Sequence, residues 1–380
     1  MASARLAFVD NLRILLITLV VAVHAAITYG GVGSWYYAEV RQPDAITLAV
    51  LTFHNALIQS FCMGLFFLLA GYFTPASYDR KGSWRFLKDR FPRLGIPLLF
   101  YGFVIHPLLI YPLAKAGVIE LDGSFRDFLG GYYSSLHIDW GPLWFVGALL
   151  IFAAIYALLR RATAARSQWS DADGKLPGNI AIAALACALG IVTFIARLWF
   201  PVGRFFGPLN FQLGFFPQYI ALFVVGVMAY RGDWLLRIDA HLGRLWLLVA
   251  AVFAVVGFPI LFVAGGALSG EVLPFLGGLH WQSLAYAVWE QVVGIAMVVG
   301  LPVLFRERIS RQTPFAHALA DSTYAVYVIH APVVILLTLA LRGVRLYPLL
   351  KFALALLVIV PACFALANVI RKLPGARRIL

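Results

Sequence analysis

The feature that most constrains this chain is a series of long apolar runs with almost no charge. Each run has roughly 20 residues, enough for a helix to cross a hydrocarbon core about 30 Å thick. Because backbone groups in lipid must be hydrogen-bonded within their own segment, every run is predicted to be a helix. Only 12% of the residues are charged, about half the share usual in soluble domains. The fold class is therefore predicted to be an all-α membrane protein, a polytopic bundle of about ten transmembrane helices. The runs are Leu12–Gly30, Leu48–Thr74, Leu94–Ala114, Leu143–Leu159, Ile180–Phe200, Leu213–Tyr230, Leu245–Gly265, Ser283–Phe305, Thr323–Leu341 and Leu349–Ile370.

The runs follow one another without a sequence repeat, a low-complexity tract or a soluble domain, so one transmembrane domain over residues 1–380 is expected. The first run lacks a small-residue cleavage site after a short apolar core, and is expected to be a retained helix rather than a signal peptide. Three cysteines, Cys62, Cys187 and Cys363, lie in apolar runs and form no CxxC pair. Neither a disulfide nor a metal site is expected from them.

The basic residues are distributed unequally between the two sets of connections. With the N-terminus in the cytoplasm, 22 of the 30 Lys and Arg fall on the cytoplasmic side and 8 on the other. Cytoplasmic loops carry such an excess, so the net charge of +13 calls for no nucleic-acid partner. We therefore expect a bacterial inner-membrane protein with both termini in the cytoplasm. Loops 80–93, 160–175 and 306–311 are expected inside, and loop 117–141 outside.

Two polar residues share one face of the first run, where such residues are costly and usually mark function. Arg13 and His24 are 11 residues apart, which places them about 20° from the same face and about 16.5 Å apart along the axis. A basic entry leading to a buried imidazole suits an anionic carrier that threads its reactive end inward. Alone, Arg13 fits an interfacial anchor and His24 an interhelical hydrogen bond; the shared face favours a functional pair. Asp10 is expected either to pair with Arg13 across one turn or to cap the helix.

The connection after the second run is strongly basic, with the sequence DRKGSWRFLKDRFPRLGIP. Arg90 and Arg93 bracket Pro92, a residue suited to the first turn of a helix. A helix start offers free N–H groups and arginines add charge-assisted donors, so this segment is predicted to bind phosphates. The remaining basic residues fit a solvated run attracted to anionic lipid headgroups. These are Arg80, Lys81, Arg85 and Lys88.

Further polar residues lie within the runs, and each alone is more typical of a helix–helix hydrogen bond than of catalysis. Tyr324, Tyr327 and His330 share a rough face of one helix through their i, i+3, i+6 spacing. Glu290 needs a partner or a water-lined cavity. The others are His54 and His106. Trp35, Tyr36, Trp140 and Trp144 fall at predicted membrane ends, where aromatic belts are usual.

Several short blocks resemble, in order along the chain, the acyltransferase-3 family of integral membrane acyltransferases. Arg13 and His24 meet the family's Arg-x10-His spacing in the first helix. FFLLAGYF, at 66–73, resembles the second-helix signature FF-x-x-SG-F/Y, with Ala70 where Ser is usual. RFPR meets the family's Arg-x-x-Arg with Arg90 and Arg93.

Two later blocks extend the resemblance over nearly the whole chain. GPLWFVGALL resembles the family's HLWFL block, with Pro142 displacing the usual His before Leu143 and Trp144. STYAVYVIHAP, at 322–332, resembles the block S-x-Y-x-x-Y-x-x-H-x-P. The stretches FHNALIQSFCMGLFFLLAGYF and GPLNFQLGFFPQYIALFVVGVMAY look most similar to the branch containing the periplasmic-glucan succinyltransferases.

The resemblance implies an enzyme that moves an acyl group, of the acetyl or succinyl class, from cytoplasmic acyl-CoA to a hydroxyl of a glycan or related acceptor outside. Acyl-CoA is then a co-substrate, and no permanently bound cofactor is implied. His24 is expected to be the general base, for which a neutral imidazole is suited. Arg13 would hold the carrier or orient the site, and Arg90 and Arg93 would bind its phosphates. Supporting roles fall to Asp10, Trp144, Glu290, Tyr324, Tyr327 and His330.

Two other classes of membrane protein, a transporter and a structural scaffold, are alternatives to an enzyme. A proton-coupled transporter would use His24, His330 and Glu290 as a relay, but its usual marks are internal repeats and paired broken helices. The sequence shows neither. A structural membrane scaffold explains the charge asymmetry but not the polar residues within the runs.

Overall fold

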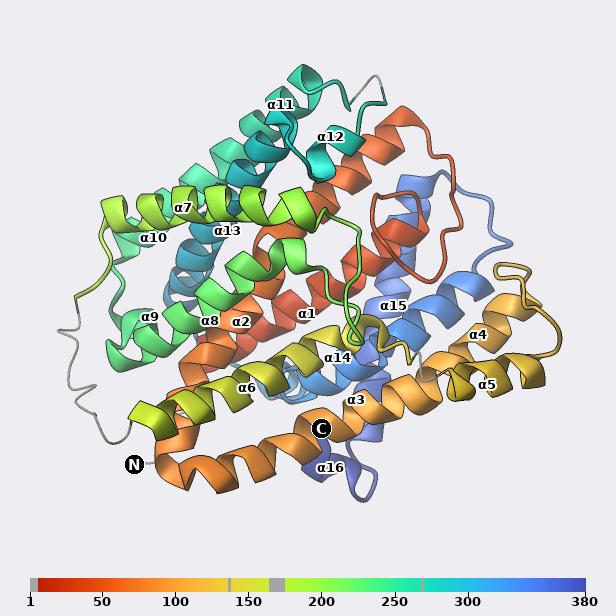
Figure 1. Cartoon of the computed structure of the whole chain (residues 1–380), viewed down its shortest axis with the longest axis horizontal. Coiled ribbons are helices and arrows are strands. Elements are labelled where there is room, and N and C mark those ends of the chain that lie inside the picture. The colour runs from red at the N-terminus through yellow and green to blue at the C-terminus, as the bar shows by residue number, and fades with distance from the viewer. Residues whose placement is uncertain (1–5, 136–137, 164–174, 268–269) are drawn as a thin grey trace.

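The computed structural model describes residues 6–135, 138–163, 175–267 and 270–380, and within these the fold is an all-helical bundle (Figure 1). Nine helical segments of the described chain are long and apolar enough to cross a membrane. The helices are α1 (Ala7–Thr28), α2 (Ala45–Arg90), α3 (Ile96–Phe100), α4 (His106–Lys115), α5 (Phe125–Ser134), α6 (Trp144–Thr163), α7 (Asn179–Trp199), α8 (Phe216–Arg231), α9 (Trp234–Arg237), α10 (Ala240–Val252), α11 (Phe258–Ala264), α12 (Leu273–Leu276), α13 (Trp281–Arg308), α14 (Pro314–Ala340), α15 (Pro348–Ile370) and α16 (Ala376–Ile379).

All ten predicted runs are helical, and the count of nine arises because two of them belong to one continuous segment. Residues 45–115 form a single helical stretch that contains α2, α3 and α4. At Gly82 the backbone adopts φ 70° and ψ 167°, a conformation open to glycine. The chain turns back near Gly82, at the end of the bundle where the orange ribbon reverses direction, so residues 45–115 provide two passes (Figure 1).

Close helix packing rests on small residues, as is usual where helices meet in lipid. A Cβ at Gly71 would collide with the carbonyl oxygen of Phe223, and one at Gly226 with that of Leu68. These two glycines therefore let α2 and α8 approach backbone to backbone. Gly71 belongs to the FFLLAGYF block, so at least one residue of that block serves packing.

The connections segregate to two ends of the bundle as the charge pattern predicts. At one end the Asn11 side chain donates to the carbonyls of Ile309 and Arg311, and Asp79 pairs with Arg160 and Arg231. At the other end Lys351 pairs with Glu39. Most of the predicted loop 160–175 and residues 1–5 lie outside the described residues.

We expect the end containing residues 80–93 to face the cytoplasm, because it carries most of the basic residues. In a Cys187→Ala background, a membrane-impermeant thiol reagent should label Arg85→Cys only from the cytoplasmic side. It should label Asp122→Cys only from the outer side. Both positions are exposed, so reactivity reports sidedness. Labelling of position 122 from the cytoplasm alone would refute this topology.

Candidate active site

The first helix brings Arg13 and His24 into the bundle at different depths. Asp10 and Arg13 form an ion pair, with Asp10 Oδ1 3.1 Å from Arg13 Nη1. Of the two roles expected for Asp10 the structure shows this pairing, since the helix begins at Ala7 with Leu6 at the N-cap position. The Arg13 guanidinium also lies 4.9 Å from the ring centre of Phe73, the last residue of the FFLLAGYF block. The first two family-like blocks are therefore in contact.

His24 lies in a cluster of three aromatic nitrogen-containing rings. Its imidazole stacks on the indole of Trp35, with ring centres 3.9 Å apart and planes 17° apart. The imidazole of His330 is 5.2 Å away at 20°. His24 is half-buried and His330 fully buried. His24 Nδ1, Trp35 Nε1 and His330 Nε2 are all buried without a hydrogen-bond partner in the described structure, which is costly in an apolar interior. Three polar atoms on adjoining rings therefore still need hydrogen-bond partners.

The late family-like block joins this cluster to two other blocks. His330 Nδ1 is 2.6 Å from the carbonyl oxygen of Tyr327. The Tyr327 hydroxyl donates to the carbonyl of Pro142, in the GPLWF block. Tyr324, one turn earlier, donates to the carbonyl of Arg93 at 2.5 Å. Residues far apart in sequence thus meet around α14.

The basic segment is placed differently from the prediction. The helix does not begin near Arg90 and Arg93: it restarts after Gly82 and passes through both arginines. Pro92 lies inside a widened π-helical turn, Phe91–Gly95, which accommodates the missing N–H without ending the helix. The expected helix-start N–H groups are therefore absent there, and any phosphate binding relies on the guanidinium groups.

The two arginines of this segment differ in their surroundings. Arg93 is exposed. Arg90 is half-buried, donates to Thr74 Oγ1 at 3.1 Å and lies 4.3 Å from the ring centre of Phe86. Since Thr74 follows Phe73, on which Arg13 lies, Arg13 and Arg90 flank one short segment of α2. The structure thus gathers basic side chains at the end where α1 begins.

A second polar cluster adjoins Trp35 at the opposite end of α1. The Tyr36 hydroxyl is 3.0 Å from that of Tyr101 and 2.9 Å from His106 Nδ1. Asp139 Oδ2 lies 4.0 Å from His106 Nε2. Burial, followed by the nearby Tyr101 and Asp139, raises the pKa of Tyr36 well above its usual value, so its hydroxyl keeps its proton.

Trp35 and Tyr36 make specific contacts inside the protein, which an aromatic belt alone does not explain. Sequence reasoning also missed Tyr101 and Asp139 as members of the cluster. Of the two tryptophans near Pro142, Trp140 donates to the carbonyl of Pro208. Trp144 stacks on Tyr219 with ring centres 5.7 Å apart.

Two other intramembrane candidates have partners of their own. Glu290 Oε2 accepts a 2.6 Å bond from Arg197 Nη2, and both side chains are fully buried. Sequence analysis predicted that Glu290 needs a partner or a water-lined cavity, but it did not identify Arg197 as that partner. His54 Nδ1 is 3.0 Å from Asn55 Oδ1, and its ring meets Phe352 edge-on. Glu290 therefore ties α13 to α7, whereas His24 and His330 tie α1 to α14.

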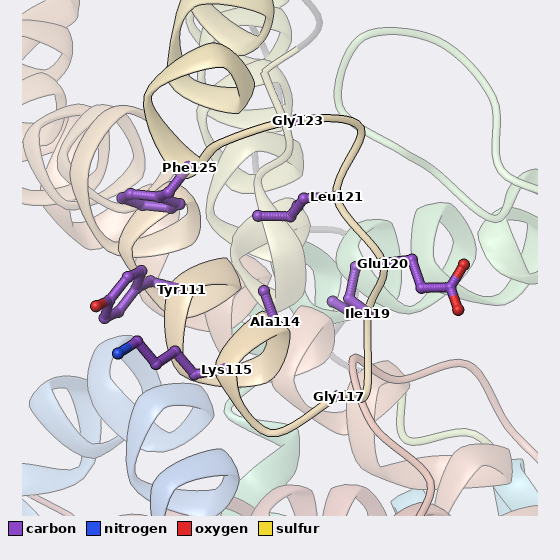
Figure 2. A pocket seen from close by; sticks show the side chains of 9 residues that line it. All are labelled: Tyr111, Ala114, Lys115, Gly117, Ile119, Glu120, Leu121, Gly123 and Phe125. Carbon is purple, nitrogen blue, oxygen red and sulfur yellow. The ribbon is translucent and has the colours of Figure 1, made fainter.

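A groove of about 690 Å³ lies between the end of α4 and the start of α5. Figure 2 shows Tyr111 and Phe125 side by side on one wall, with Lys115 next to Tyr111 and the Glu120 carboxylate directed away from them. None of the candidate catalytic side chains lines the groove. Consecutive ring contacts through Phe128, Tyr132, His106 and Tyr36 nevertheless connect Phe125 with Trp35.

Comparison with known proteins shows which family the chain belongs to. The model of the acyltransferase-3 family, described as an acyltransferase domain, matches residues 6–368. The chain belongs to the acyltransferase-3 family. It is therefore a membrane acyltransferase.

Curated relatives point to one branch of the family. The chain is 22% identical to glucans biosynthesis protein C of Escherichia coli O1:K1 / APEC over 335 residues, covering 86% of this chain and 81% of the relative. It is 23% identical to the protein of that name from E. coli K12 / DH10B over 231 residues, covering 59% and 57%. This weak similarity agrees with the branch expected from the sequence. No solved structure matches the chain.

Proposed function

We propose that the protein transfers an acyl group, of the acetyl or succinyl class, from cytoplasmic acyl-CoA to a hydroxyl of a periplasmic or surface glycan. The observation that carries this proposal is the meeting of His24 and His330, from two family-like blocks, between a basic end and an aromatic end of the bundle. The glucan-related name of the similar E. coli proteins supports a glycan acceptor.

His24 acts as the general base in this proposal. It removes the proton from the acceptor hydroxyl while the hydroxyl oxygen attacks the thioester carbonyl. The C–S bond then breaks, and the coenzyme A thiolate takes the proton from the imidazolium. A neutral imidazole suits both transfers. His24 is partly buried whereas His330 is fully buried, so His24 is the better placed of the two to meet a substrate.

The donor approaches from the basic end, where its phosphates meet guanidinium groups. Arg13 and Arg90 flank Phe73 and Thr74, and Arg93 is exposed nearby on the same helical turn. Arginine–phosphate contacts are charge-assisted and strong. The acceptor approaches from the other end, where Trp35, Tyr36 and His106 lie close together.

Arg90→Ala should weaken acyl-CoA binding more than it slows turnover of the bound donor. Losing one charge-assisted contact typically costs about 1.5–3 kcal/mol, which is roughly a 10- to 150-fold weaker affinity. Donor affinity and single-turnover rate of purified protein would be measured for Arg90→Ala and Arg93→Ala. Arg85→Ala, exposed in the same basic run, is the matched control and should bind normally. Unchanged donor affinity with a slower turnover would contradict the phosphate-binding role.

The proposal as a whole is tested by incubating detergent-purified protein with acyl-CoA and following thiol release and acyl transfer. Mass spectrometry of glycans from cells with and without the protein would identify the acceptor. The transporter alternative depended on Glu290 as a relay group. The ion pair between Glu290 and Arg197 gives that carboxylate a structural role that needs no transport function. A protein that only transports would release no thiol from acyl-CoA.

A further inference from the structure

The tautomer of His330 is fixed by its surroundings. Its Nδ1 lies 2.6 Å from the carbonyl oxygen of Tyr327, and a carbonyl oxygen only accepts hydrogen bonds. Nδ1 must therefore carry the ring proton. A neutral imidazole has one donor and one acceptor nitrogen, so His330 Nε2 carries a lone pair. That atom is buried and has no partner in the described structure.

His24 also has a ring nitrogen that lacks a hydrogen-bond partner. Its Nδ1 is also buried without a partner. If the proton of His24 is on Nδ1, the neighbouring rings present one unsatisfied donor and one unsatisfied acceptor. Leaving two such atoms unpaired costs more than pairing them. The unsatisfied donor, His24 Nδ1–H, and the unsatisfied acceptor, His330 Nε2, thus belong to adjacent side chains on α1 and α14.

The ring geometry is close to that of such a bond. An N–H···N bond between coplanar imidazoles, with nitrogens about 2.9–3.0 Å apart, places the ring centres about 5 Å apart. The His24 and His330 ring centres are 5.2 Å apart, and their planes differ by 20°. The observed ring spacing and the small angle between the planes therefore fit such a bond.

We infer that His330 is a positioning residue for His24. Its Nε2 accepts the Nδ1–H of His24, and this fixes His24 in the tautomer whose Nε2 carries the lone pair. The chain of contacts then runs from the Tyr327 carbonyl through His330 to His24, and His24 Nε2 takes the proton from the acceptor hydroxyl. This rests on the proposed acyl transfer. The arrangement follows the general rule that a catalytic base is oriented by a further group.

Trp35 provides the competing arrangement. Its Nε1 is a donor without a partner, and its ring centre is 6.3 Å from that of His330. A bond from Trp35 to His330 Nε2 would leave His24 without an orienting partner. The experiment must therefore report the tautomer of His24 itself.

The test is ¹⁵N NMR of histidine-labelled full-length protein in lipid nanodiscs, without substrate. The His24 signals are assigned by their loss in His24→Gln. In the wild type, His24 Nδ1 should be protonated and Nε2 unprotonated. His330→Phe, which keeps a ring but removes the acceptor, should shift His24 toward the Nε2–H tautomer. His330→Gln, which keeps an acceptor oxygen, should retain the wild-type pattern. An Nε2–H tautomer in the wild type, or no change in His330→Phe, would overturn the inference.

Kinetics separate this inference from the proposed function. His330→Phe should lower kcat about 10- to 100-fold, as is typical when an orienting partner of a functional histidine is lost, and His330→Gln should recover most of it. Donor affinity should change less than about two-fold. Were His330→Phe to misfold, the wild-type spectrum and His330→Gln would still decide. A wild-type protein with the expected tautomer but no acyl transfer would refute the proposed function alone.

Discussion

Replacing His24 with alanine should abolish acyl transfer while leaving a folded, membrane-inserted protein. Loss of a general base typically lowers the rate about 10²–10⁴-fold, so a glycan assay would detect almost no acylated product. Folding should survive because alanine is a better helix former than histidine. Removing the His24 ring takes away only the partner inferred above for His330 Nε2, an atom that already has no hydrogen-bond partner in the described structure. Transfer would be measured in purified membranes at equal protein level.

His54→Ala is the matched control for this experiment. His54 is also a histidine within a membrane-spanning helix, but it contacts Asn55 and Phe352 rather than the His24 cluster. We expect transfer close to that of the wild type. His330→Ala should fall between the two, since His330 supports the base. Near-normal transfer by His24→Ala, or a loss explained only by degradation, would refute the assignment of His24.

The helices were predictable because of how lipid constrains a backbone. Every apolar run long enough to cross the bilayer must satisfy its N–H and C=O groups internally, so the ten runs could be recognised without knowledge of their packing. The spacing of Arg13 and His24 could be interpreted for the same reason, because α1 is an uninterrupted helix from Ala7 to Thr28. Local rules of this kind apply within one element.

The contacts of the site could not be predicted, since they join elements far apart in the chain. Trp35 lies in the connection after α1, where position alone suggested an interfacial aromatic residue, yet it stacks on His24. Tyr36 meets Tyr101 and His106 across more than 60 residues of sequence. The predicted helix start at Arg90 was wrong because Pro92 commonly marks a first turn. Here a π-helical turn accommodates the proline inside a helix.

Glu290→Gln should be the most destabilising conservative substitution among the intramembrane polar residues. Glu290 and Arg197 are fully buried and joined by a 2.6 Å bond, and the guanidinium is flanked by the rings of Phe215 and Tyr286. Removing one member leaves the other charge buried and uncompensated, which typically costs about 3–5 kcal/mol. Arg197→Met should cost a similar amount. The free energy of unfolding would be measured by steric trapping in bicelles.

The double substitution distinguishes a structural pair from a functional one. Replacing both members of a buried ion pair by apolar residues of similar size is often neutral or stabilising, so Arg197→Met with Glu290→Met should recover most of the stability lost in either single variant. Because this pair ties α7 to α13 rather than contacting His24, transfer should recover with it. If the double variant is stable but inactive, Glu290 or Arg197 takes part in the reaction. The assignment of this pair to the scaffold would then be wrong.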